Sequence, residues 1–93
     1  MTKISEYLKK GYENRISTMD LMTIFGLDSV RELRRCINAE RLQGAAILST
    51  KNGGGYYLPE NEDEKNEFVA MMRAEARTLV KVAEAVENGA PAV

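Results

Sequence analysis

Apolar and polar residues alternate with a helical period near the N-terminus, which predicts a short first helix over residues 4–10. Ile4, Tyr7 and Leu8 lie at positions i, i+3 and i+4 and so share one face of that helix. Gly11 follows and is expected to end it.

A second helix of about two turns is predicted upstream of Gly26. Ser17 or Thr18 can begin it, because a hydroxyl oxygen accepts a hydrogen bond from a free amide of the first turn. Gly26 ends the helix at no steric cost. The expected apolar face comprises Leu21, Ile24 and Phe25.

The third predicted helix runs from about Val30 to Leu42, with Gly44 as its stop. Ser29 and Glu32 have the spacing of a capping box. Leu33, Ile37 and Cys36 are expected to face inward. The polar positions must then face outward: Arg31, Arg34, Arg35, Asn38 and Arg41.

A β-hairpin is predicted after the third helix. Residues 45–50 are compatible with a strand, Asn52 and the glycines after it indicate a tight turn, and residues 56–58 form the return strand. Alternation places Tyr56 and Leu58 on one face and Tyr57 on the other. Pro59 ends the pairing because it lacks an amide hydrogen.

A long helix is predicted at the C-terminal end of the chain. Asn61 with Glu64 marks its start, and no Pro or Gly follows until Gly89, so it could span about 27 residues, or roughly 40 Å. Its apolar stripe is continuous and consists of Phe68, Val69, Met72, Ala76, Leu79, Val80, Ala83 and Val86. Residues 89–93 are expected to be a flexible tail.

These elements predict a mainly α fold with a small β-hairpin (α+β): a winged helix-turn-helix over residues 1–60 and a C-terminal helix over residues 61–88. The run Gly55-Tyr56-Tyr57-Leu58-Pro59 resembles the G-Y-x-L-P that closes the wing in the N-terminal DNA-binding domain of biotin protein ligase/repressor proteins. Gly26-Leu27 and residues 31–37 are similar to the turn and recognition helix of that family. The resemblance implies DNA binding of the kind found in small winged-helix proteins of phage and mobile elements, without the catalytic domain of the ligases.

Composition argues against several other classes of protein. The chain has a single cysteine, Cys36, so an intrachain disulfide is impossible. It has no histidine, which argues against a zinc or haem site and removes the commonest general base of enzymes. We expect no enzyme activity, no metal, no cofactor and no small-molecule ligand. No apolar run approaches the ~18 residues of a membrane span, which favours a cytoplasmic protein that does not contact a membrane.

Charge is distributed unevenly and suggests a polyanion as the partner of the first part of the chain. Residues 1–58 hold nine Lys/Arg and six Asp/Glu, a net charge of +3, whereas residues 59–93 hold four and eight, a net charge of −4. In a helix-turn-helix the second helix enters the major groove, where arginine pairs with guanine or phosphate and asparagine with adenine. The candidate DNA-binding residues are therefore Arg31, Arg34, Arg35 and Asn38 in that helix, Thr18 in the helix before it, and Lys51, Asn52 and Tyr57 in the wing.

Other interpretations of these residues remain open. The arginines could form a solvated face, Tyr57 could pack against the neighbouring strand rather than stack on a base, and the whole domain could be a protein–protein interaction adaptor without DNA binding. Double-stranded DNA binding is the leading hypothesis. It would make the protein a transcriptional regulator or a replication accessory factor.

The C-terminal helix predicts a homodimer. A helix of this length cannot cover its apolar stripe on so small a body, and pairing with its own copy is the simplest solution. The predicted interface residues are Phe68, Met72, Leu79, Ala83 and Val86. The alternative is a helix that folds back on its own domain.

Overall fold

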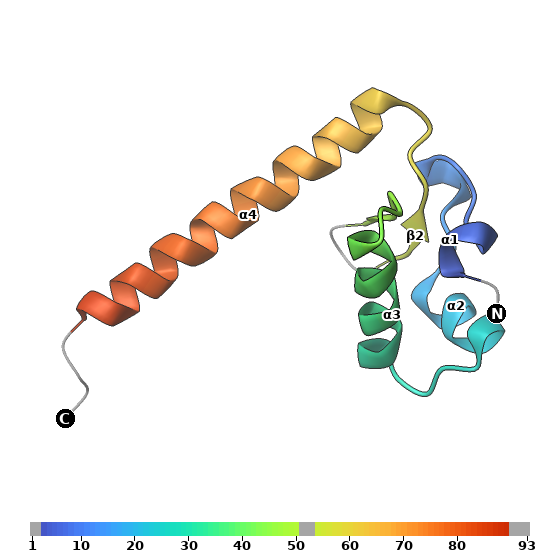
Figure 1. Cartoon of the computed structure of the whole chain (residues 1–93), viewed down its shortest axis with the longest axis horizontal. Coiled ribbons are helices and arrows are strands. Elements are labelled where there is room, and N and C mark those ends of the chain that lie inside the picture. The colour runs from blue at the N-terminus through green and yellow to red at the C-terminus, as the bar shows by residue number, and fades with distance from the viewer. Residues whose placement is uncertain (1–2, 51–53, 90–93) are drawn as a thin grey trace.

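The computed structural model describes residues 3–50 and 54–89 of the chain and confirms the predicted fold class (Figure 1). The fold is mainly helical, with one antiparallel two-stranded hairpin and a long C-terminal helix. The elements follow in the order α1 (Ile4–Tyr7), the 3-10 helix η1 (Tyr12–Asn14), α2 (Thr18–Phe25), α3 (Val30–Leu42), β1 (Leu48–Ser49), β2 (Tyr56–Tyr57) and α4 (Glu62–Asn88).

Local capping interactions begin the three longer helices at the predicted residues. The hydroxyl of Ser17 accepts from the amide of Asp20 at 3.1 Å, that of Ser29 accepts from the amide of Glu32 at 3.1 Å, and the Asn61 carbonyl oxygen accepts from the amide of Glu64 at 2.9 Å. Each cap satisfies an amide that has no partner within its helix.

One detail of the predicted capping box is wrong. The Glu32 carboxylate accepts from the amide of Asp28 at 3.2 Å, one residue before the N-cap, rather than from Ser29 itself. Glu64 does the same at the start of α4, where it accepts from the amide of Glu60 at 3.0 Å. The carboxylate of the third helical residue therefore holds the incoming chain in both helices.

The first helix is shorter than predicted because backbone pairing with the hairpin replaces its second turn. Leu8 is already extended, with φ −70° and ψ 150°. The amide of Leu58 donates to the carbonyl of Lys9 at 2.8 Å, and the amide of Gly11 donates to the carbonyl of Leu58 at 2.8 Å. Ile4 and Leu8 nevertheless enter the core, while Tyr7 is 45% exposed.

The core lies where α1, α2, α3 and the hairpin meet. The buried cluster consists of Ile4, Leu8, Leu21, Leu33, Ile37, Ile47 and Tyr56. Phe25 packs against this cluster, and Cys36 does the same from α3. Ile24 was predicted to face the core but is 44% exposed, because α2 directs Leu21 and Phe25, one turn apart, toward α1 and α3.

The hairpin pairs Leu48 with Tyr57 and Ser49 with Tyr56. A further bridge connects its second strand to the segment before α2, since Ile16 and Tyr56 exchange two hydrogen bonds of 2.9 Å. Gly55 lies beside this bridge, and a Cβ atom there would sit 2.7 Å from the Ile16 carbonyl oxygen. This close approach requires the glycine that precedes Tyr56 in the sequence. Lys51 and Asn52 lie outside the described residues.

α4 leaves the body of the protein instead of folding back on it (Figure 1). The radius of gyration is 16.1 Å, compared with about 12 Å expected for a compact chain of this length. None of the residues of α4 is buried. The predicted length of this helix is confirmed, and the fold-back alternative is not what the structure adopts.

The Glu40 carboxylate joins the C-terminal half of α3 to the start of α1. Its two oxygens accept from the amides of Ile4 at 2.8 Å and Ser5 at 2.9 Å. Partial burial raises the pKa of Glu40, but the amide hydrogen bonds outweigh it, so the pKa lies below its ordinary value in the folded protein. Glu40 therefore acts as a long-range cap for α1.

We expect Glu40→Ala to lower the free energy of unfolding at neutral pH by about 1–2 kcal/mol, because two amides of α1 lose their acceptor. Since the folded-state pKa of Glu40 is lowered, its stabilising effect is present above the unfolded-state pKa and is lost as the pH falls through the folded-state pKa. The free energies of unfolding of wild type and variant, measured by urea titration, should therefore become equal at acidic pH. Glu13→Ala, at an exposed carboxylate of η1, is the matched control and should change stability little at either pH.

Candidate nucleic-acid interface

The exposed side of α3 carries a row of polar side chains. Leu33 and Ile37 are buried and define the inner side of the helix. At about 100° per residue, Arg31, Arg35 and Asn38 point away from that side, and all three are exposed. The predicted outward orientation of these residues is confirmed.

Leu42 continues the same row and was not identified from the sequence as a candidate. It follows Arg31, Arg35 and Asn38 at the spacing i, i+4, i+7 and i+11, and it is 90% exposed. The periodicity counted from Arg31 could have found it. An exposed leucine at the end of a polar row is suited to contact with an apolar group such as a thymine methyl.

The arginines of this face have no partner of their own in the described part of the chain. Arg31, Arg34 and Arg35 make no hydrogen bond, ion pair or ring contact there. Arg34 lies on the flank of the helix, in a groove whose other lining residues are Ile37, Asn38, Arg41, Ser49, Tyr56 and Met72. The three guanidinium groups are thus free to meet an external anion.

Arg41 was expected to face outward with these arginines, and that expectation is wrong. Its Nε donates to the carbonyl of Ile47 at 2.8 Å, and its Nη atoms lie 3.3 Å from Asn38 Oδ1 and 3.4 Å from Ser49 Oγ. The guanidinium carbon is 5.4 Å from the ring centroid of Phe68. Burial lowers the pKa of Arg41, which still leaves an arginine charged at neutral pH. Arg41 therefore joins α3, the hairpin and α4.

α2 places Thr18 at its first position, preceding α3 in the helix-turn-helix order. Thr18 is half-buried and already interacts with other residues of the chain. Thr23, on the exposed side of α2, donates its hydroxyl to the carbonyl of Met19 at 3.0 Å. The α2–α3 connection spans only Gly26 to Ser29, so the two helices are held close together.

On the face of the hairpin opposite Tyr56, aromatic packing covers most of the Tyr57 side chain. Tyr57 is only 8% exposed, and its ring meets that of Tyr12 edge to face, with centroids 5.7 Å apart. This corrects the assignment of Tyr57 as a nucleic-acid contact, because a base could not stack on a covered ring. The alternative, packing within the chain, is the one observed.

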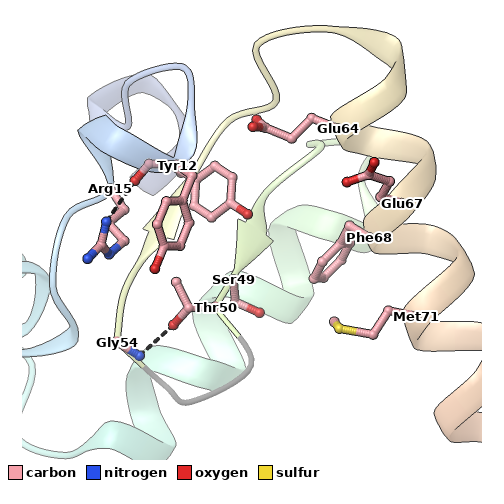
Figure 2. Close-up of a pocket in the computed structure, with 10 residues that line it drawn as sticks. Tyr12, Arg15, Ser49, Thr50, Gly54, Glu64, Glu67, Phe68 and Met71 are labelled. Atoms are coloured by element: carbon pink, nitrogen blue, oxygen red, sulfur yellow. Dashed lines mark hydrogen bonds between the residues drawn. The ribbon is translucent and has the colours of Figure 1, made fainter.

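A cleft lies between this face of the hairpin and the base of α4 (Figure 2). Glu64 and Glu67 enter it from α4, opposite Tyr12 and Arg15. Arg15 lies over the Tyr12 ring, 4.1 Å from its centroid. Burial, followed by the nearby Glu64 carboxylate, raises the pKa of Tyr57. Glu64 and Glu67 disfavour a phosphate at their side of the cleft, whereas α3 carries the exposed Arg31, Arg34 and Arg35.

Residues 3–50 and 54–89 contain neither a candidate metal site nor a candidate membrane-spanning helix. Within these ranges no group of three or more His, Cys, Asp or Glu side chains could hold a metal ion. No helix in the described part of the chain is long and apolar enough to cross a membrane.

Comparison with models of known protein families, with curated proteins and with solved structures found no match.

Substitution of Arg41 and of Arg35 tests whether Arg41 stabilises the fold while Arg35 does not. We expect Arg41→Ala to lower the free energy of unfolding by about 1–3 kcal/mol, because the Ile47 carbonyl loses a charged donor and three elements lose their common contact. Arg35→Ala should change it by less than about 0.5 kcal/mol, since the side chain is exposed and unpaired. Urea unfolding followed by circular dichroism measures both. Equal effects would contradict the assignment of Arg41 as a structural residue.

Proposed function

We propose that this protein binds double-stranded DNA by inserting α3 into the major groove, and that it acts as a small transcriptional regulator or replication accessory factor of the phage or mobile-element type. The observation that supports the proposal most directly is the row of Arg31, Arg35 and Asn38 on the outward side of α3, flanked by Arg34. These arginines have no partner among the residues that the structure describes. A protein of this kind would work in the cytoplasm.

The chemistry of each side chain in the row suits a base edge or a phosphate. The major groove is about 12 Å wide and admits one helix. An arginine guanidinium donates two parallel hydrogen bonds to guanine O6 and N7 or to phosphate oxygens. Asn38 could pair with adenine, and Leu42 could contact a thymine methyl. The start of α2, with Thr18, would lie near the DNA backbone and position α3.

Arg31→Ala/Arg35→Ala tests the proposal directly. In fluorescence anisotropy with a labelled mixed-sequence duplex of about 20 base pairs, wild-type affinity should fall steeply as salt increases. The double variant should bind at least about tenfold more weakly at low salt and lose about two units of salt slope if both arginines contact phosphates. Its unfolding curve should match that of wild type.

Arg77→Ala/Lys81→Ala is the matched control, because it removes the same charge from the exposed surface of α4. Its affinity for the duplex should stay within about twofold of wild type. If both double variants lose the same affinity, the binding is a general charge effect and α3 has no special role. If wild type binds no duplex at low salt, the proposal fails.

A protein–protein adaptor is the second candidate function, and the cleft beside α4 favours it. Aromatic rings of Tyr12, Tyr57 and Phe68 and the carboxylates of Glu64 and Glu67 line the same cleft. Such a surface suits a basic segment of another protein, since cations are attracted to carboxylates. Absence of duplex binding in the assay above, together with capture of a partner that Glu64→Gln/Glu67→Gln abolishes, would favour the adaptor.

A further inference from the structure

The exposed apolar row of α4 has the periodicity of a coiled coil. Val69, Ala76 and Ala83 form one series of seven-residue steps, and Met72, Leu79 and Val86 form a second, so the spacing alternates between three and four along residues 69–86. Exposure rises away from the body, from 44% at Met72 to 68% at Leu79 and 75% at Val86. We call these six residues the α4 seam.

Phe68 does not belong to the seam, although the sequence suggested it as an interface residue. Its side chain is half-buried and lies beneath the guanidinium of Arg41. Phe68 and Met71 face the cleft next to the hairpin and connect the base of α4 to the body. Val69 and Met72 are partly covered near the body, whereas the rest of the seam is exposed in the described part of the chain. An isolated helix gains little stability in water without a covering surface.

We propose that the α4 seam binds the α4 seam of a second copy of this chain, with the two helices antiparallel. In the register we infer, Val69 lies opposite the partner's Val86, Met72 opposite the partner's Ala83, and Ala76 opposite the partner's Leu79. The two-fold axis then passes between Arg77 and Thr78. This pairing does not depend on DNA binding.

The sizes of the seam residues favour the antiparallel register. In a parallel pair each layer would join identical residues, so thin layers of alanine would alternate with thick layers of methionine or leucine. In the antiparallel register Met72 and Leu79 each meet an alanine, and the two valines meet each other. The layers then have similar volumes, so the helix axes can stay at one separation along the whole contact.

Charge around the inner end of the seam favours the same orientation. Met72 shares its groove with Arg34, Asn38 and Arg41 of α3. A parallel partner would bring a second arginine-bearing α3 toward this groove. An antiparallel partner brings the C-terminal end of its α4, which has the negative end of the helix dipole and carries the partner's Glu84 and the partner's Glu87. The partner's carboxylates and helix C-terminus then approach the arginines that line this groove.

Self-association is tested first by mass in solution. Sedimentation at micromolar concentration should give twice the mass of the 10.4 kDa chain. Leu79→Glu should give a monomer, because it buries a charge at the centre of the seam. Thr78→Glu, next to it and exposed on another face of α4, should remain a dimer. A monomeric wild type, or equal behaviour of the two variants, would overturn the proposal.

Orientation is tested by disulfide trapping in a Cys36→Ala background. Met72→Cys/Ala83→Cys should form a covalent dimer on mild oxidation, because the inferred register brings these positions together across the axis. Within one chain they are roughly 16 Å apart along the helix, too far for a disulfide. Met72→Cys alone should stay uncrosslinked. Rapid crosslinking of that single variant would show parallel helices and reject the antiparallel register.

Discussion

The burial of Leu33 and Ile37 sets the rotation of α3, and the orientation of the basic surface follows from it. These two side chains are almost inaccessible to solvent and lie one turn apart, so the helix can face the core in only one way. Arg41 secures this orientation at the other end of α3 by bonding to the carbonyl of Ile47. Arg31 and Arg35 point outward as a geometric consequence. If α3 were rotated, unpaired guanidinium groups would be buried, and the free energy of the folded state would be much higher than in the observed orientation.

The same arrangement places the exposed arginines of α3 and the carboxylates of Glu64 and Glu67 on different elements. The basic row lies on α3, whereas Glu64 and Glu67 line the cleft on the second face of the hairpin. The slightly negative net charge of the chain therefore says little about its surfaces. What a polyanion encounters depends on the side from which it approaches, since exposed charges act over roughly 10 Å at ordinary salt.

α4 differs from the other helices because only its first turns contact the other residues that the structure describes. Its start is determined by the Asn61 cap and the Glu64 carboxylate, and its base is held by the contact of Phe68 with Arg41. Beyond Met72 the helix has regular apolar spacing, and no other part of the described chain covers it. The body thus presents a basic helix, and α4 presents an apolar seam. The two surfaces are separate, so association through one need not change the other.

Interactions between near neighbours in the chain were determined by the sequence itself. The caps at Ser17, Ser29 and Asn61 involve residues three apart, and the exposure of Arg31, Arg35 and Asn38 follows from helical periodicity alone, which is why these features were predicted correctly. The tertiary structure decided contacts between distant segments: Lys9 with Leu58, Tyr12 with Tyr57, and Arg41 with Ile47 and Phe68. Those contacts shortened the first helix, covered Tyr57 and turned Arg41 into a structural residue. A local pattern gives the side of an element on which a residue lies, but not which distant residue comes to cover it.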